Sequence, residues 1–194
     1  MKILKIAILT ASLAGVMSAQ ANLIINGGFE TGDYAGWTFT PATSGSVFLV
    51  TSDLTGYGNH SGNFVANFGA VGGQDDTLSQ TVATTPGGSY VFDFWLAANA
   101  SSSMTVSWDR NTLLQISNGG PFGWTHYSYD VVASGNFTDL TSFAGRNAPS
   151  WIALDDVSLT AAVPEPSTYL AGALLLLPFG LQGIRHLRSR KQAA

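Results

Sequence analysis

The chain has 194 residues, a net charge of −4 at neutral pH and no cysteine, which excludes a disulfide framework. The charge is uneven, because residues 22–162 hold two arginines against eleven acidic residues, a net charge of −9 for this part. Such an acidic segment argues against nucleic acid and anionic lipid as partners, since their phosphates require basic patches. Its length suits one domain with a core of its own.

The first 21 residues have the pattern of a secretory signal peptide. Lys2 and Lys5 precede the apolar stretch 6–16, and Ala19-Gln20-Ala21 follows it. A signal peptidase reads this arrangement of small residues. The pattern predicts export through the inner membrane, with cleavage by signal peptidase after Ala21.

Residues 22–162 show the pattern of an all-β domain. Short runs of β-branched and aromatic residues are separated by Gly, Asn, Ser and Pro. The expected strands cover residues 47–50, 77–83, 90–96, 104–108, 127–132 and 151–159. In one of them Phe92, Phe94 and Leu96 share a face and leave Trp95 on the other. No stretch has convincing helical periodicity, so the sequence predicts an antiparallel β-sandwich, and the number of strands suits a jelly roll.

The last 32 residues, 163–194, have the composition of a membrane anchor. Val163-Pro164-Glu165-Pro166 precede an uncharged apolar run, 169–184, and four basic residues follow it. As a helix this run reaches about 24 Å, somewhat less than the hydrocarbon core of a bilayer, so it spans only if the bilayer thins or neighbouring residues are drawn in. The basic end keeps the C-terminus cytoplasmic. The tail is expected to form a single hydrophobic, transmembrane-type helix.

The order of these parts resembles a PEP-CTERM sorting signal, in which a Pro-Glu-Pro motif, an apolar segment and a basic end follow one another. The resemblance implies a Gram-negative exported protein that a membrane peptidase of the exosortase type sorts through the motif Val163 to Pro166. It also implies a location at the cell surface or in the extracellular matrix, with at least transient anchoring in the membrane.

Two segments of the domain resemble the first and last strands of galactose-binding-like jelly rolls, which include several carbohydrate-binding module families. These segments are Asn26-Gly27-Gly28-Phe29-Glu30 and Leu154-Asp155-Asp156-Val157. The resemblance covers nearly all of residues 22–162. It implies the fold and a non-catalytic role in binding extracellular polysaccharide, although the same fold serves adhesion domains.

The same resemblance implies a structural calcium ion that ties the first strand to the last. Carried over by position, Glu30 and Asp156 provide carboxylate oxygens, Gly28 a backbone carbonyl, and residues 59–62 the remaining ligands. Ca²⁺ takes six to eight oxygen ligands, which suits this set. Within the segment that corresponds to residues 59–62 the family often places an acid, whereas this chain has Asn59 and His60 there. The alternative is that the two acids of the last strand simply end it at the surface.

Catalysis has little support in the sequence. Residues 22–162 contain two histidines and neither a G-x-S-x-G nor an H-E-x-x-H pattern. In the adjacent pairs Asp75-Asp76 and Asp155-Asp156 the side chains should point to opposite faces of an extended strand, which is wrong for a shared glycosidase site. His60 is expected to be a hydrogen-bonded loop residue. The protein is therefore predicted not to be an enzyme.

Exposed aromatic rings are the remaining candidates for ligand contact, because sugars stack their C–H faces on such rings. The resemblance implies that the rings of Trp37 and Trp124 pack in the core. Trp108 is expected there as well, because it alternates in phase with Met104 and Val106. Trp95, which is out of phase with the core face, and Tyr57, which lies in a glycine-rich loop, are the expected ligand-binding residues. The alternative functions are a structural or adhesion matrix protein that binds other proteins or itself, and adhesion to ice, against which the absence of a Thr-x-Thr ladder argues.

Overall fold

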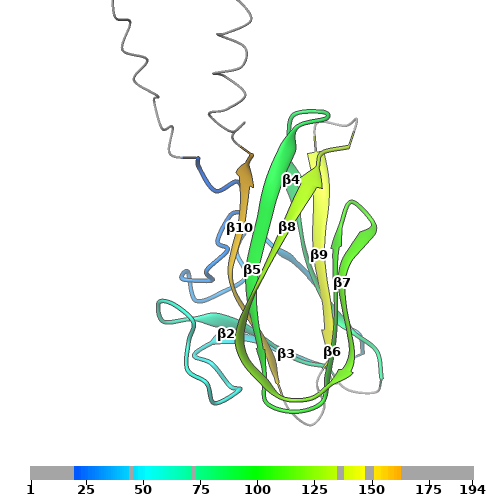
Figure 1. Ribbon diagram of the computed structural model, residues 1–194. Helices are drawn as coiled ribbons and strands as arrows, with labels where there is room; N and C mark the ends of the chain where they lie inside the picture. Colours follow the sequence, from blue (N-terminus) through cyan, green and yellow to red (C-terminus); the bar gives the residue numbers. More distant parts are fainter. Residues whose placement is uncertain (1–19, 44–45, 71–72, 135–137, 147–150, 163–194) are drawn as a thin grey trace, which may run out of the picture.

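The computed structural model describes residues 20–43, 46–70, 73–134, 138–146 and 151–162 (Figure 1). Within these ranges the strands are β1 (Thr38–Thr40), β2 (Val47–Thr51), β3 (Val65–Gly69), β4 (Asp76–Ala83), β5 (Ser89–Ala98), β6 (Ser102–Trp108), β7 (Asn111–Gly119), β8 (Phe122–Val132), β9 (Thr138–Arg146) and β10 (Ile152–Ala161). They form two antiparallel five-stranded sheets, with the orders β1-β4-β9-β6-β7 and β2-β3-β10-β5-β8. The predicted all-β sandwich is confirmed.

The core lies between the two sheets and follows the predicted alternation. Phe92, Phe94 and Leu96 of β5 are fully buried, whereas Trp95 between them is only partly buried. Phe143 of β9 meets Phe94 edge to face across the sandwich, with ring centroids 5.2 Å apart. The inner face of β5 therefore packs on the opposite sheet, and its outer face, with Trp95, is left for other contacts.

Each of the predicted strands is present, as β2, β4, β5, β6, β8 and β10, and four further strands were not predicted. All five residues of β3 are buried, so it lacks the alternation that marks a strand with one solvated face. The edge strand β7 is largely polar and has no fully buried residue. Both strands depend on their neighbours in the sheet more than on a pattern of their own.

The N-terminal segment of the domain lies beside β10, as the resemblance implies. The N–H of Leu23 donates to the carbonyl of Leu159 over 2.9 Å, and the N–H of Val157 donates to the carbonyl of Gly27 over 2.9 Å. A Cβ atom at Gly27 would collide with the Val157 carbonyl, so the close approach requires glycine. These contacts hold residues 22–30 along β10 beyond its pairing with β3, and Ile24 and Phe29 of this segment belong to the core.

Both ends of the chain fall largely outside the described residues. The predicted signal peptide is described only at Gln20 and Ala21, and the predicted sorting tail with its helix, residues 163–194, is not described. In the described part of the chain, no helix is both long and apolar enough to cross a membrane.

Candidate ligand-binding and cation sites

A β-bulge in β10 brings two adjacent acids to the same side of the sheet. The register of β10 on β5 shifts between Asp155 and Ser158, and Asp156 has a left-handed backbone with φ of 48°. One carboxylate oxygen of Asp155, one of Asp156 and a ring nitrogen of His60 all lie within 4.8 Å of one another. The prediction that these two acids point to opposite faces was wrong, because the bulge interrupts the alternation of the strand.

The other adjacent pair follows the alternation. Asp76 is fully buried and accepts the N–H of Ala42 over 2.9 Å. Asp75 is partly exposed and pairs with Arg146 over 3.0 Å. Their side chains do not share a site, as predicted.

Asp155 is the buried member of the bulge pair. It has no exposed surface, and its two oxygens accept the N–H groups of Ser61, over 3.1 Å, and of Asp156, over 2.7 Å. Burial raises the pKa of Asp155 to about 7, while the two backbone hydrogen bonds act in the opposite direction. The fold therefore holds a carboxyl group in a place where its negative charge is poorly solvated.

Asp156 is partly exposed and is held by the loop that contains His60. Its Oδ2 lies 2.6 Å from Nδ1 of His60, and its Oδ1 accepts the hydroxyl of Ser61 over 2.8 Å. The prediction that His60 is a hydrogen-bonded loop residue is confirmed. Its partner in the last strand could not be read from the sequence.

The expected calcium ligands Gly28 and Glu30 lie beside the same pair of acids. A Cβ built on Gly28 would stand 3.4 Å from Oδ1 of Asp156, 3.9 Å from Oδ1 of Asp155 and 3.9 Å from Cγ of Glu30. The carboxylate of Glu30 accepts the N–H of Asn63, over 2.9 and 3.0 Å. It also accepts the next backbone N–H along the chain, over 3.0 Å. Gly28 thus lies next to both acids of the bulge, whereas the carboxylate of Glu30 is bound by the backbone of residues 63 and 64.

The surroundings of Gly28 are acidic. Oδ1 of Asp155, Oδ1 of Asp156 and the Cγ atom of Glu30 lie within 4 Å of the position that a Cβ at Gly28 would take. Among the ion pairs of the described residues, these three acids have only His60 as a basic partner, while Arg146 pairs with another acid. Clustered carboxylates repel one another, and oxygen ligands together with backbone carbonyls suit a hard cation.

Trp95 lies beside this cluster on the outer face of β5. In the sheet its neighbours are Asp155 of β10 and His126 of β8. The ring of His60 stacks on Trp95 with centroids 3.9 Å apart and an angle of 22° between the planes, and His126 stacks at 4.9 Å and 25°. His126 is oriented by Asp93, which lies 3.0 Å from its Nε2. Trp95 is therefore outside the sandwich core, and histidine rings contact it.

Tyr57 projects from a loop that a single carboxylate organises. Asp53 accepts the backbone N–H of Thr55, over 2.9 Å, and those of residues 56, 57 and 58, over 2.9, 2.9 and 3.0 Å. At the tip the side chain of Tyr57 is 48% exposed. The ring lies beside the surface strand β8, since a Cβ at Gly123 would be 3.7 Å from it.

Trp124 joins the two predicted ligand residues, and its prediction as a core residue was wrong. Its indole N–H donates to the carbonyl of Gly58 over 2.6 Å, and its ring meets His60 at 5.6 Å. It is only partly buried. The signal was present in the sequence, because Trp124 alternates in phase with His126 and out of phase with Tyr127, which contacts the core.

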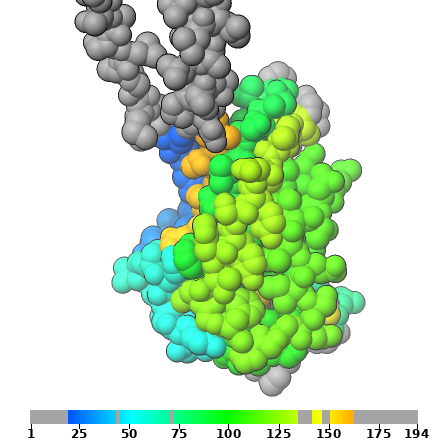
Figure 2. Space-filling view, in the orientation of Figure 1, coloured from blue at the N-terminus to red at the C-terminus, as the bar shows by residue number. Residues whose placement is uncertain are grey.

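Together these side chains form a surface feature that we call the aromatic row. Its members are Tyr57, Trp124, His60, Trp95 and His126. The row crosses from the loop 52–64 to β5 and β8. In the space-filling view the cyan loop lies against the yellow-green surface of β8 (Figure 2). Trp37 and Trp108 are buried, as predicted.

The outer face of the other sheet has a different character. Leu78 and Val82 of β4 are buried, so the residues that alternate with them face outward. Hydroxyl residues occupy many of the outward positions of β1, β4, β6 and β9. They are Thr38, Thr40, Thr77, Ser79, Thr81, Thr105, Ser107 and Ser142. The register thus aligns hydroxyl residues from separate strands, a feature that the absence of a Thr-x-Thr ladder in the sequence did not indicate.

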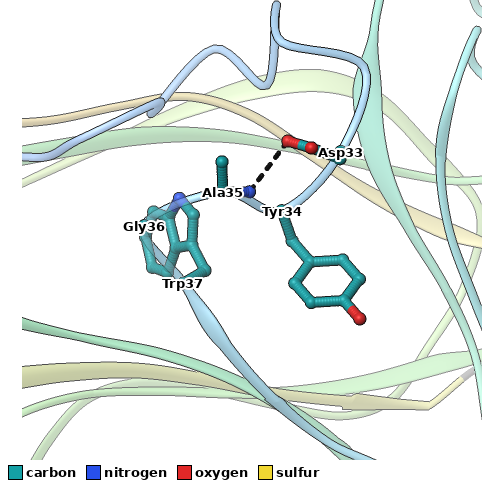
Figure 3. Close-up of a pocket in the computed structure, with 5 residues that line it drawn as sticks. All are labelled: Asp33, Tyr34, Ala35, Gly36 and Trp37. Carbon is teal, nitrogen blue, oxygen red and sulfur yellow. Dashed lines mark hydrogen bonds between the residues drawn. The ribbon is translucent and has the colours of Figure 1, made fainter.

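A shallow cavity of about 430 Å³ lies in the loop before β1 and is lined by residues 33–37 (Figure 3). Asp33 accepts the hydroxyl of Thr31 over 2.7 Å and the N–H of Ala35 over 2.9 Å. These hydrogen bonds, that of Thr31 first, lower the pKa of Asp33. The cavity contains none of the predicted site residues.

No protein-family model and no curated protein sequence matches this chain. Solved structures do match. The carbohydrate-binding module TmCBM61, solved with β-1,4-galactotriose, has a TM-score of 0.58 and 20% identity over 73% of this chain and 99% of its own. The CBM22-1 xylan-binding domain of Xyn10C from Paenibacillus barcinonensis has a TM-score of 0.52 and 14% identity over 76% of this chain and 100% of its own.

Proteins with other roles share the fold. An adhesin domain of Lys-gingipain from Porphyromonas gingivalis has a TM-score of 0.54 and 21% identity over 73% of this chain and 98% of its own. The enzymatically active domain of tailspike protein 4 from bacteriophage CBA120 has a TM-score of 0.56 and 16% identity over 73% of this chain, which spans only 21% of that protein. At such identities the likeness shows the fold alone, that of carbohydrate-binding modules among others.

Proposed function

We propose that residues 22–162 form a non-catalytic domain that binds extracellular polysaccharide through the aromatic row. The observation that carries the proposal is a set of rings on one surface: His60 contacts both Trp95 and Trp124, and Tyr57 lies beside Gly123, the residue before Trp124. Flat rings that are partly exposed offer apolar surface to the C–H groups of a sugar. The solved modules that share the fold include one that binds a β-1,4-linked galactose trimer and one that binds xylan.

The charge of the domain narrows the ligand to neutral glycans. Residues 22–162 carry eleven acidic residues and two arginines, and one of these arginines is already paired with Asp75. Acidic side chains also border the aromatic row, since Asp93 contacts His126 and Asp156 contacts His60. A polysaccharide rich in uronate or sulfate would be repelled. The acidic groups instead serve as acceptors for sugar hydroxyls.

The test is retention of the full-length protein, purified in mild detergent, by insoluble neutral polysaccharides that include galactan and xylan. Tyr57→Ala and Trp95→Ala should each weaken retention by roughly tenfold, which corresponds to the loss of about 1.4 kcal/mol of binding free energy. Tyr34→Ala is the matched control, because Tyr34 is 47% exposed, close to the 48% of Tyr57, but has no contact with the row. Equal retention of all four proteins would reject the row as the binding surface.

We also propose a structural calcium ion at Gly28, Glu30 and Asp156, with Asp155 as an additional acidic neighbour. The proximity of Gly28 to Oδ1 of Asp155, Oδ1 of Asp156 and Cγ of Glu30 supports the proposal. When bound, the ion would offset the repulsion between the carboxylates and tie the N-terminal segment to β10.

Export and sorting complete the proposed function. We propose that residues 1–21 are removed by signal peptidase, and that the tail 163–194 anchors the protein until an exosortase-type peptidase acts at Val163 to Pro166. The order of motif, apolar run and basic end in the sequence supports this assignment. The domain would then act at the surface or in the matrix of a Gram-negative cell.

Adhesion is the second candidate function, and the hydroxyl-rich face of the β1-β4-β9-β6-β7 sheet favours it. Rows such as Thr38, Ser79 and Ser142 align across strands and present uncharged hydroxyls. One of the solved structures with this fold is an adhesin domain. If variants of the aromatic row are still retained by glycans, the hydroxyl-rich face becomes the binding surface to test. Binding of the protein to ice would identify ice as its target.

A further inference from the structure

His60 brings a nitrogen atom to the two acids of the β10 bulge. Its Nδ1 lies 2.6 Å from Oδ2 of Asp156, and the side chain of His60 is 24% exposed against 35% for Asp156. With Asp155 they form a group of three donors within 4.8 Å of one another. Across the described ranges of the chain, no other three side chains of His, Cys, Asp or Glu come this close.

The geometry of this group suits a small ion with mixed nitrogen and oxygen ligands. Zn²⁺ binds histidine nitrogen and carboxylate oxygen at about 2.0 to 2.2 Å, so two ligands on opposite sides of the ion stand at most about 4.4 Å apart. Donors within 4.8 Å therefore reach a shared ion after small movements of the side chains. Imidazole is a ligand typical of zinc, copper, nickel and iron, whereas Ca²⁺ takes oxygen.

The surroundings add an electrostatic reason for a cation at this place. Asp155 has no exposed surface, and Asp156 follows it directly in the chain. In the part of the chain that the structure describes, no lysine or arginine forms an ion pair with either of them. A buried carboxylate is costly without a counter-charge, and a divalent ion supplies one to both acids at once.

We propose that His60, Asp155 and Asp156 bind a divalent transition-metal ion of the Zn²⁺ class through the Nδ1 atom and one carboxylate oxygen of each aspartate. Three protein ligands leave a position for water. The inference does not depend on glycan binding. Asp156 also belongs to the proposed calcium set, so the two ions should compete for the protein.

Trp95 provides a direct signal for an ion bound at His60. Its ring stacks on His60 at 3.9 Å, and Trp124 approaches the same imidazole at 5.6 Å. A paramagnetic ion held by that imidazole should therefore quench indole fluorescence. Co²⁺ replaces Zn²⁺ in sites with mixed nitrogen and oxygen ligands. Its visible absorption bands report on the ligands, and the quenching of tryptophan fluorescence reports that the ion lies near Trp95 and Trp124.

The experiment titrates chelator-treated, full-length protein in mild detergent with Co²⁺ and then with Zn²⁺. We expect Co²⁺ to quench tryptophan fluorescence and to produce visible absorption that saturates at one equivalent, and Zn²⁺ to reverse both. His60→Gln should lower the affinity for both ions by at least about tenfold, the loss that is usual even for a residue that only orients a ligand. Excess Ca²⁺ should compete with Co²⁺ in the parent protein.

His126→Gln is the matched control, because His126 also stacks on Trp95 and also contacts an aspartate, Asp93, but lies outside the cluster. The His126→Gln variant should bind Co²⁺ with unchanged affinity.

The proposal is overturned if Co²⁺ does not bind saturably. It is also overturned if His60→Gln is folded, as measured by circular dichroism, and binds Co²⁺ as tightly as the parent protein does. For a His60 variant that does not fold, X-ray absorption of the zinc-loaded parent decides: imidazole scattering supports the proposal, and a shell of oxygen alone rejects it. Binding of calcium without Co²⁺ would reject this site and leave the calcium proposal intact.

Discussion

At the scale of single residues, Asp53 shows how one carboxylate shapes a binding surface. Its Oδ2 accepts three consecutive backbone N–H groups, and its Oδ1 accepts the N–H and the hydroxyl of Thr55. Gly56 and Gly58 have positive φ values of 91° and 79°, which let the chain wrap around the acid. Tyr57 between them is fixed at the tip of the loop. The backbone that carries its ring therefore has little conformational entropy left to lose on binding.

Asp53→Asn should therefore weaken glycan binding through Tyr57, although Asp53 itself belongs to no proposed binding surface. The amide replaces one acceptor oxygen with a donor group, so backbone N–H groups lose a charged partner at a cost of about 1.5 to 3 kcal/mol in stability. Urea unfolding and retention by galactan measure the two effects. Asp33→Asn is the control, because Asp33 holds a similar small loop at Thr31 and Ala35, away from the aromatic row. If Asp53→Asn retains parental binding, the loop does not need this carboxylate to present the ring.

At the scale of elements, alternation along a strand predicted some of the site and failed at one bulge. It placed Trp95 on the outer face of β5 correctly, and the same rule applied to β8 would have placed Trp124 beside it. It failed for Asp155 and Asp156, because the positive φ of Asp156 turns the chain within β10. A bulge leaves no reliable mark in the sequence when its residues are not glycine. The partner of His60 was equally hidden, since it lies 96 positions away in the chain.

The link between the N-terminal segment and β10 leads to a prediction at this scale. Calcium added to chelator-treated protein should raise the melting temperature, because an ion that binds only the folded state stabilises it by mass action. Glu30→Gln and Asp156→Asn should remove most of that increase. Differential scanning calorimetry with and without calcium measures it, and Asp75→Asn, on the opposite sheet, is the control. Identical melting curves in calcium and in chelator would reject the calcium site.

At the scale of the whole molecule, the class of fold could be predicted from the sequence. Which side chains lie on each of the two outer faces of the sandwich could not. Turn residues and alternating runs predicted the sandwich, because a sheet with one buried face repeats every second residue. The hydroxyl-rich face was missed, since it is assembled by register from strands such as β1 and β9, which have no clear pattern. The aromatic row likewise depends on a loop that crosses to β8. Contacts between distant segments, rather than local patterns, decide which side chains share a surface.

The predicted anchor can be separated from the described domain, and this gives a test of the whole arrangement. The last described residue, Ala162, follows β10 and donates its N–H to Ser89 over 2.8 Å, so the sandwich is closed before the tail begins. Deletion of residues 163–194 should therefore release the exported domain into the medium and leave its unfolding transition within about 1 kcal/mol of the parent, because no described core residue is lost. Cell fractionation and urea unfolding measure the two outcomes. The control replaces Pro164 and Pro166 with alanine and keeps the apolar run, which should leave the protein in the membrane fraction. A truncated protein that stays with the membrane, or that unfolds, would show that the tail is not a separable anchor.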